Sequence, residues 1–323
     1  MKLAVLGAGK IVQEFLPLVE KMEGLEVLSI YSTKRSLDKN KQLANTYHIT
    51  KVSTEIEELL ADPEIDTVYV ALPNHLHYEF VKKALEADKH VICEKPFTLR
   101  KKQLDELAEL AESKQLILIE AITTVDLPNF QVIKDYMKKI GPVRLINCNF
   151  VQYSSRYDAF LAGDIAPVFN PEKGGGALVD LNIYNIHFVL GLLGEPEKIQ
   201  YLPNMNRGVD TSGLLTLSYE DAQVNCMGSK DSHGIKQILI QGENGVIIIE
   251  DGTNSLDDAK VVIDGQVKQI NFNGNKHRMI PEFEAFIQII KDNDLAEVKK
   301  RMTHSKMVMA VLDDAIKDGE LNI

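Results

Sequence analysis

The sequence predicts an α/β protein of two domains: a doubly wound parallel sheet, then an α+β domain with a large, mostly antiparallel open sheet. In the first 120 residues, short apolar strands alternate with amphipathic helices, the pattern of a parallel sheet covered on both faces. Beyond them, strand-like runs follow one another, separated by Gly, Asn and Asp clusters suited to hairpins. We therefore expect one domain over residues 1–121 and a second over residues 122–323.

Apolar periodicity defines the elements expected in the first domain. Leu104, Leu107 and Ala111 recur at helical spacing, as in a helix that lies on a sheet. The expected strands are Lys2–Leu6, Glu26–Tyr31, Thr67–Leu72, His90–Cys93 and Leu116–Ile119. The expected helices are Ile11–Lys21, Leu37–Tyr47, Ile56–Leu60, Tyr78–Ala87 and Arg100–Ser113.

The second domain is expected to be rich in strands with few helices. The expected strands are Val143–Tyr153, Gln200–Met205, Gly213–Tyr219, Gln223–Met227, Gln237–Gln241, Val246–Glu250 and Lys260–Ile263. The expected helices are Asn129–Ile140, Ala177–Leu193, Pro281–Lys291 and Ser305–Lys317.

The amino-acid composition indicates what kind of partner the protein binds and where it is located. A formal net charge of −11 argues against binding to nucleic-acid phosphates, so the expected partner is a small molecule. The three cysteines, Cys93, Cys148 and Cys226, lack metal-site spacing and are expected to be buried thiols. No signal peptide or membrane-length apolar run is evident, which predicts a soluble, cytoplasmic protein.

A glycine-rich turn directly follows the first strand. Gly7 and Gly9, with Lys10 and Ile11 opening the next helix, match the Rossmann turn that receives a dinucleotide pyrophosphate on backbone N–H groups. Val12 replaces the third small residue of that pattern, so a plain strand–helix turn is the alternative.

The end of the second expected strand indicates which dinucleotide is preferred. NAD-binding domains usually carry a carboxylate there for the ribose hydroxyl, whereas this chain offers Ser32, Lys34 and Arg35 and no acid before Asp38. Cationic and hydroxyl groups suit a 2′-phosphate, so we expect NADP, with NAD as the alternative if the basic turn is merely solvated.

A lysine follows the strand His90–Cys93. In Glu94-Lys95-Pro96, the lysine lies at the carboxyl end of a strand, where open α/β sheets bind ligands. That position predicts a chemical role for Lys95.

Several motifs, taken in order, resemble one family. GAGKIV at the start, PNHLH at 73–77, ADKHVICEKP at 87–96 and GGGALVDLNIY at 174–184 are similar to the Gfo/Idh/MocA oxidoreductases, which include glucose–fructose oxidoreductase, inositol dehydrogenases and dimeric dihydrodiol dehydrogenase. HRMIPEFEAF and the final helix extend the resemblance over nearly the whole chain.

The resemblance implies a nicotinamide cofactor on the first domain and a substrate held by the second. The family's EKP lysine matches Lys95, and its D-x-x-x-[HY] pair matches Asp180 and Tyr184. Its nicotinamide-side residues match Leu72, Pro73, Asn74, His77 and Glu94. The alternative for His77 is a purely structural role. We expect no metal at His75 and His77.

The chemistry of these residues agrees with that implication. Asp180, Tyr184 and His187 fall at i, i+4 and i+7 and share one helix face. Hydride transfer to a carbonyl needs a proton donor and nearby positive charge, roles that Tyr184 and Lys95 suit, with Asp180 orienting them or binding a substrate hydroxyl. The alternatives are a helix cap for Asp180, a core tyrosine at 184 and a packing role for His187.

Two departures from the family's pattern bear on the substrate. Asn182 stands where glycine is common, and the stretch 122–128 lacks an arginine that relatives often have. Tyr153 and Arg156, at the exit of the first long strand of the second domain, are the alternative substrate contacts.

The sequence therefore predicts an NADP-preferring dehydrogenase or reductase acting on CH–OH groups of a sugar-like or cyclic compound. An enzyme that keeps its cofactor bound, and a cofactor-sensing protein without catalysis, are the alternatives. Relatives dimerise through the open sheet face, which implies a homodimer, with a tetramer as the alternative.

Overall fold

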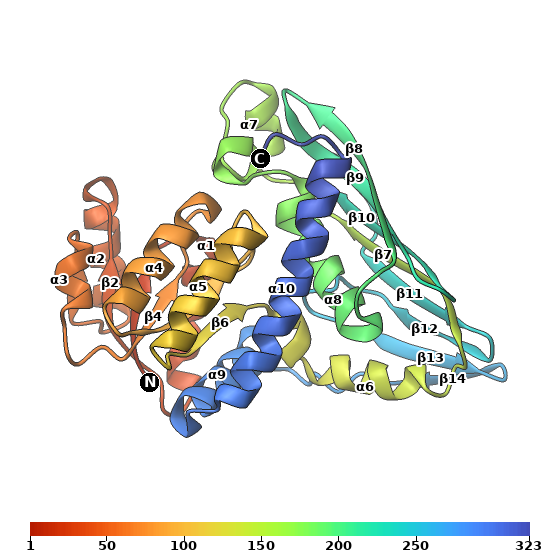
Figure 1. Cartoon of the computed structure of the whole chain (residues 1–323), viewed down its shortest axis with the longest axis horizontal. Helices are drawn as coiled ribbons and strands as arrows, with labels where there is room; N and C mark the ends of the chain where they lie inside the picture. Colours follow the sequence, from red (N-terminus) through yellow and green to blue (C-terminus); the bar gives the residue numbers. More distant parts are fainter. The chain divides into compact units, whose positions relative to one another are not determined.

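The computed structural model describes residues 1–323, which form two compact units (Figure 1). The first unit comprises residues 1–121 and 282–306, and the second comprises residues 122–281 and 307–323. Segment 282–306, which the sequence analysis assigned to the second domain, belongs to the first unit. The reason is aromatic packing, because the Phe283 ring lies 4.4 Å from that of Phe15 and 5.3 Å from that of Tyr69.

The first unit contains the expected doubly wound sheet. Its six strands are all parallel, in the order β3-β2-β1-β4-β5-β6. The strand order therefore reverses between β1 and β4, and open α/β sheets bind ligands at the carboxyl ends of such strands. The strands are β1 Lys2–Leu6, β2 Glu26–Tyr31, β3 Lys51–Ser53, β4 Thr67–Val70, β5 His90–Glu94 and β6 Leu118–Ala121.

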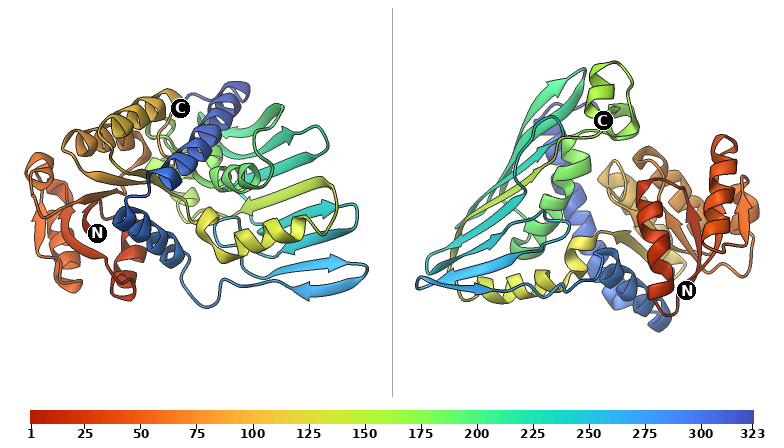
Figure 2. Two further views of the ribbon diagram at one scale, coloured as in Figure 1. Left: turned by 60° about the horizontal axis from the view of Figure 1, so that its bottom comes forward. Right: turned by 180° about the vertical axis from the view of Figure 1, so that it is seen from behind.

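Helices cover both faces of this sheet. Helices α4 and α5 lie side by side on one face, and α1 lies on the other (Figures 1 and 2). The α-helices are α1 Lys10–Phe15, α2 Leu37–Thr46, α3 Ile56–Leu60, α4 His77–Glu86, α5 Lys101–Ser113 and α9 Met279–Asp292. The 3-10 turns are η1 Leu16–Lys21, η2 Lys34–Ser36 and η3 Asn74–Leu76.

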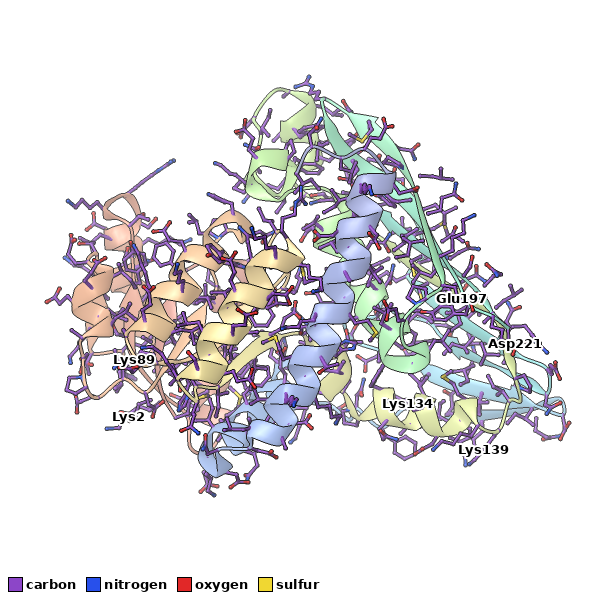
Figure 3. The ribbon with its side chains drawn as sticks, viewed as in Figure 1. Lys2, Lys89, Lys134, Lys139, Glu197 and Asp221 are labelled. Carbon is purple, nitrogen blue, oxygen red and sulfur yellow. The ribbon has the colours of Figure 1, made fainter.

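One buried lysine of this unit has a purely structural role. Lys89, 8% exposed, precedes β5 (Figure 3). Its ammonium donates to the carbonyl oxygens of Asp62 (2.9 Å) and Ile65 (2.8 Å). These bonds tie the loop before β4 to the start of β5.

The second unit contains the expected open sheet. Its eight strands run in the order β14-β13-β12-β11-β7-β10-β9-β8, and every neighbouring pair is antiparallel except β7 and β10. Parallel β7 and β10 therefore end at the same edge. The strands are β7 Val143–Val151, β8 Lys198–Asn206, β9 Val209–Ser218, β10 Gln223–Ser229, β11 Gln237–Gly242, β12 Gly245–Ile249, β13 Ala259–Ile263 and β14 Gln266–Gln269.

Helices cover one face of this sheet, and the other face carries none (Figure 2). The helical segment of residues 171–193 is long and apolar enough to span a membrane. However, 67% of its most apolar stretch is buried inside the structure, as in the core helix of a globular unit. The α-helices are α6 Pro128–Met137, α7 Tyr157–Leu161, α8 Ile183–Leu193 and α10 Leu295–Asp318, whose first half belongs to the first unit. The shorter turns are η4 Thr123–Asp126, η5 Pro167–Phe169, η6 Pro171–Lys173 and the π-helical turn η7 Leu178–Asn182.

Candidate active site

The turn after β1 has the backbone that a pyrophosphate requires. Gly7 has a φ of +112°, and a Cβ there would lie 2.5 Å from the Ala71 carbonyl oxygen, so only glycine fits. Gly9 caps α1 with no side-chain hydrogen bond, and nothing lies within 4 Å of where its Cβ would be. The open space at a helix start fits a dinucleotide phosphate.

The residues after this turn divide between surface and core. Lys10 is exposed, and its Nζ lies 3.9 Å from Glu14 Oε1, while Ile11 is half-buried. Val12 is completely buried. The third position of the motif is therefore a packing position here, which explains why a larger apolar residue is accepted.

The turn after β2 presents two cationic side chains. Lys34 and Arg35 are exposed on η2 and engage no acidic residue. Ser32, which the sequence analysis grouped with them, is 1% exposed, and its hydroxyl donates to the Thr33 carbonyl oxygen at 2.9 Å. Ser32 therefore shapes the turn, and the charge available to a 2′-phosphate comes from Lys34 and Arg35.

The Glu94-Lys95-Pro96 turn at the end of β5 is held by buried side chains on both sides of the lysine. The Tyr69 hydroxyl, from β4, donates to Glu94 Oε1 at 2.5 Å. On the other side, the Phe97 backbone N–H donates to Glu120 Oε1 at 3.1 Å. Glu120 is 4% exposed and also accepts from the Ser305 hydroxyl at 2.6 Å. Lys95 thus projects from a turn whose neighbours are fixed.

His77 joins this turn to the one after β4. The ring is fully buried, with Nδ1 2.9 Å from the Pro96 carbonyl oxygen and Nε2 2.8 Å from that of Leu72. Burial lowers the pKa of His77, while the hydrogen bonds to the two carbonyl oxygens act in the opposite direction. His77 therefore positions the Leu72–Asn74 turn against Lys95-Pro96 and contributes no free nitrogen to a cofactor or a metal.

In the second unit, Asp180 is paired with a lysine that sequence analysis did not single out. Asp180 lies in η7, and its Oδ2 accepts from Lys230 Nζ at 2.8 Å. Lys230 directly follows β10 and is 2% exposed, whereas the Asp180 side chain is 28% exposed. No sequence motif surrounds Lys230. Its possible role becomes visible only from its burial beside Asp180.

Tyr184 and His187 lie in α8, about one and two helical turns after Asp180. Tyr184, in α8, is 9% exposed and packs against the Phe150 ring, with centroids 5.7 Å apart. His187 is completely buried. The shared face predicted for Asp180, Tyr184 and His187 therefore passes from a partly open position into the core, which favours the packing role of His187.

The asparagine that replaces the family's glycine has a visible function. The Asn182 amide donates to the Cys226 carbonyl oxygen at 3.0 Å, and its side-chain oxygen accepts from Asn185 at 2.8 Å. The Asn185 amide also lies 3.2 Å from the Met227 carbonyl oxygen. Asn182 therefore fastens the helix that carries Asp180 and Tyr184 to the end of β10.

Aromatic groups gather where β7 and β10 end. Tyr153 stacks on His233, with centroids 4.6 Å apart, and its hydroxyl donates to Asp158 at 2.6 Å. This hydrogen bond raises the pKa of Tyr153, so Tyr153 is no acid near neutral pH. Arg156 is exposed at the start of α7. His233 lies on an irregular loop, where no local pattern marks it in the sequence.

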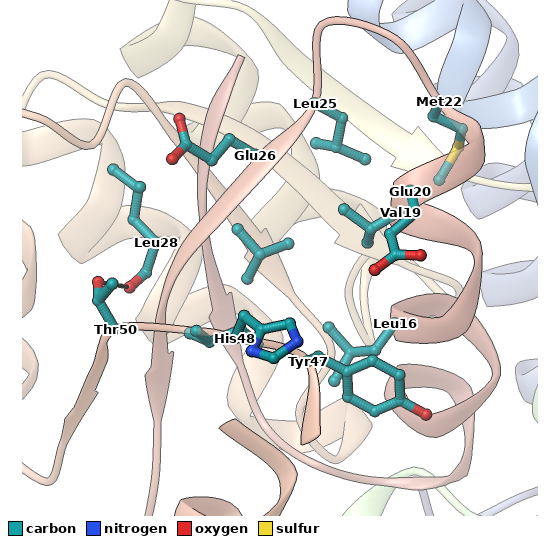
Figure 4. A pocket seen from close by; sticks show the side chains of 12 residues that line it. Leu16, Val19, Glu20, Met22, Leu25, Glu26, Leu28, Tyr47, His48 and Thr50 are labelled. Atoms are coloured by element: carbon teal, nitrogen blue, oxygen red, sulfur yellow. Dashed lines mark hydrogen bonds between the residues drawn. The ribbon is translucent and has the colours of Figure 1, made fainter. Parts of the chain in front are cut away.

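The first unit also has a surface pocket of about 300 Å³ (Figure 4). Its lining includes Glu26 and Leu28 from the amino half of β2, together with Leu16, Tyr47 and His48. Parallel strands bind ligands at their carboxyl ends, so this pocket is not the dinucleotide site.

The fold and these turns define a class of protein that sequence comparison confirms. Residues 1–122 match the family described as "Oxidoreductase family, NAD-binding Rossmann fold", and residues 131–248 match the "GFO/IDH/MocA C-terminal domain". The chain therefore belongs to the Gfo/Idh/MocA oxidoreductase family.

Individual relatives span almost the whole chain. Scyllo-inositol 2-dehydrogenase (NADP(+)) IolU of Bacillus subtilis (strain 168) is 32% identical over 98% of this chain and 96% of that protein. Trans-1,2-dihydrobenzene-1,2-diol dehydrogenase of Xenopus tropicalis is 26% identical over 98% and 97%. The structure of KijD10, a 3-ketoreductase from Actinomadura kijaniata with NADP and TDP-benzene, has the same fold, with a TM-score of 0.86 at 21% identity over 98% and 97%.

Proposed function

We propose that this protein is an NADP-preferring dehydrogenase or reductase that acts on the CH–OH or carbonyl carbon of a sugar-like or cyclic polyol. The observation that carries the proposal is Lys95, at the carboxyl end of β5 in a turn held by Tyr69, His77 and Glu120. Related enzymes named for scyllo-inositol, D-xylose and a cyclic dihydrodiol support this substrate class.

We assign each proposed site residue one part in the hydride-transfer reaction. A bound nicotinamide supplies or accepts the hydride. In the reducing direction, the Tyr184 hydroxyl donates its proton to the substrate oxygen, and the Lys95 ammonium stabilises negative charge on that oxygen. Asp180 accepts a hydrogen bond from a substrate hydroxyl or from Tyr184. Tyr153 and Arg156 are the proposed substrate contacts outside this group.

The cofactor preference rests on exposed charge. Lys34 and Arg35 offer two cations after β2, where a ribose-binding carboxylate would otherwise lie. We propose that the two cations bind the 2′-phosphate, while Gly7 and Gly9 admit the pyrophosphate and Leu72–Asn74 lies by the nicotinamide.

A paired titration tests the cofactor assignment first. Purified protein is titrated with NADPH and with NADH, followed by fluorescence and melting temperature. We expect at least tenfold tighter binding of NADPH, about 1.4 kcal/mol. A Lys34→Ala/Arg35→Ala variant should lose this preference, whereas Lys41→Ala, an exposed lysine on α2, should keep it. Equal or tighter binding of NADH would contradict the assignment.

A substrate panel then tests the reaction class. NADP⁺ reduction is followed with scyllo-inositol, myo-inositol, D-xylose and a cyclic trans-diol, and NADPH oxidation with the corresponding ketones. We expect turnover with at least one polyol. Tight cofactor binding with no turnover on the panel would favour a cofactor-sensing protein instead.

We also propose how the protein assembles and where it is located. The helix-free sheet face exposes apolar side chains such as Leu202 and Met227, so we propose a homodimer through it. The three cysteines are free and buried, which suits a reducing, cytoplasmic location.

A further inference from the structure

We propose that Lys230 is a positioning residue that holds Asp180 for binding of a hydroxyl group. This inference rests on the proposed function, because it gives Asp180 its part in the site. Neither the sequence motifs nor the named relatives assign a role to Lys230. Four observations within the second unit support it: three contacts of its ammonium, its burial, the anchoring of the neighbouring helix and the partial exposure of Asp180.

Three groups surround the Lys230 ammonium. Nζ donates to Asp180 Oδ2 at 2.8 Å and to the Val168 carbonyl oxygen at 2.6 Å. It also lies 4.6 Å from the centroid of the Phe169 ring. A carboxylate, a carbonyl and an aromatic face therefore fix the ammonium in one place. The position of Asp180 Oδ2 is fixed with it.

Burial alone does not separate Lys230 from Lys89, but their partners differ, because Lys89 bonds to carbonyl oxygens and Lys230 also to a carboxylate. A lysine that is 2% exposed has lost most of its water, and the cost of this is offset only by good partners. An apolar side chain of similar volume often stabilises such a position equally well or better. A buried cation beside a partly open carboxylate is therefore better explained by what it does to the carboxylate.

The end of β10 also fixes the backbone around Asp180. Asn182 bonds to the Cys226 carbonyl oxygen, and a Cβ on Gly228 would lie 3.1 Å from Asn182 Cβ, so the π-helical turn lies directly on the strand. Such turns often occur at functional sites. Lys230 comes two residues after Gly228, so the same strand end orients both the turn and the side chain.

Lys230 holds Asp180 from the buried side, and part of the Asp180 side chain remains exposed. Its side chain keeps 28% of its surface exposed, against 3% for that of Lys230. An ionised carboxylate only accepts hydrogen bonds. Asp180, whose Oδ2 is positioned by a buried cation, is therefore suited to accept from a hydroxyl of a polyol or from Tyr184.

A double-mutant cycle tests this role. Wild type, Lys230→Met, Asp180→Asn and the double variant are compared for kcat and KM with NADP⁺ and the best substrate of the panel, with NADPH affinity and melting temperature measured in parallel. Lys89→Met is the matched control, because Lys89 is also buried but bonds only to carbonyl oxygens.

We expect each single variant to lose at least tenfold in kcat/KM while NADPH affinity stays within about twofold. The double variant should lose no more than Asp180→Asn alone, because Lys230 acts through Asp180. Lys89→Met should lower the melting temperature and leave kcat/KM nearly unchanged. If Lys230→Met fails to fold, Lys230→Arg, which keeps the charge but moves it, takes its place in the cycle.

Three results would overturn the proposal, and the first two can be told apart from the third. Losses in kcat/KM that multiply in the double variant, or a Lys230 variant with full kcat/KM, would show that Lys230 does not act through Asp180. Wild-type protein that binds NADPH but turns over nothing on the panel would contradict the proposed function, and the role of Lys230 would fall with it.

Discussion

Lys95 and Tyr184 are embedded in different ways, and the difference bears on how each would act. The lysine follows a strand and projects from a turn whose flanking groups are bonded to Tyr69, His77 and Glu120. The tyrosine is 9% exposed and packed against Phe150. The first arrangement fixes the backbone from which Lys95 projects, and the second restricts the Tyr184 ring directly.

Removing either functional group should stop the chemistry without unfolding the protein. We expect Lys95→Met and Tyr184→Phe to lower kcat by about 10²-fold or more, the range lost with a general acid. NADPH affinity should change by less than about threefold. The measurement is steady-state kinetics with the panel substrate, beside a fluorescence titration.

Tyr219→Phe serves as the control for the tyrosine. The Tyr219 hydroxyl donates to the Gly194 carbonyl oxygen at 2.9 Å, in the same unit but in another loop. The Tyr219→Phe variant should retain the wild-type kcat. Full turnover in Tyr184→Phe would show that another group supplies the proton.

Asp210 gives the protein a pH-dependent stability. Burial raises its pKa from 3.8 to about 6, although it accepts hydrogen bonds from the Leu178 N–H and the Tyr201 hydroxyl. Between pH 4 and 6 the unfolded chain loses this proton before the folded one does, so rising pH favours unfolding.

The variant Asp210→Asn isolates this effect. The unfolding free energy of wild type, relative to the variant, should fall by up to about 3 kcal/mol between pH 4 and pH 7, from the size of the shift. Urea unfolding at several pH values measures it. A difference that does not vary with pH would mean that Asp210 ionises normally.

At the scale of elements, strand ends carry the candidate site. The turns after β1, β2, β4 and β5 carry Lys95 and the residues proposed to bind the cofactor in the first unit. In the second, the end of β10 anchors the π-helical turn and α8 through Asn182 and Lys230. Rigid strands thus set the positions, while the turns bear the chemistry.

The two glycines of the first turn should respond differently to a methyl group. Gly7→Ala places Cβ 2.5 Å from the Ala71 carbonyl oxygen at a φ of +112°, so we expect a loss of about 1–3 kcal/mol in stability. Gly9→Ala meets nothing within 4 Å, so the fold should remain intact while NADPH binds at least tenfold more weakly. Melting temperature and NADPH titration distinguish the two. Unchanged NADPH affinity in Gly9→Ala would place the pyrophosphate elsewhere.

At the scale of the whole molecule, the helix-free face of the second sheet is the feature that most needs a partner. Strand register places Leu202, Leu214 and Met227 in one row across β8, β9 and β10. Leu202 is 56% exposed and Met227 is 39% exposed. This short apolar row is flanked on the same face by the polar row Gln200, Thr216 and Asn225, and it is the part of the face that would suit an interface.

If this row forms the interface of the proposed homodimer, a charge introduced into it should separate the two protomers. We expect the wild type to elute as a dimer and Leu202→Glu/Met227→Glu as a monomer in size exclusion with light scattering. Leu161→Glu, on α7 and outside the sheet, should remain dimeric. A wild-type monomer at working concentration would contradict the assignment.

The periodicity of the chain was enough to predict most elements. β1 and β2 have the expected bounds, because strands buried on both faces form clear apolar runs. β14 was missed because all four of its residues are exposed and give no alternation. The first ten residues of α10 were missed because they are rich in charge, as in Lys299, Lys300 and Arg301.

The sequence by itself determined the two kinds of sheet, the family and the motif residues Gly7, Lys95, Asp180 and Tyr184, because these depend on local spacing and short-range turn chemistry. Only the tertiary structure decided that Ser32 is buried, that His77 joins two turns, that 282–306 returns to the first unit and that Lys230 holds Asp180. Each of these depends on groups brought together from distant parts of the chain, such as Asp180 and Lys230, 50 residues apart. Local pattern carries no record of such pairs, because burial and partner are set by the path of the whole chain.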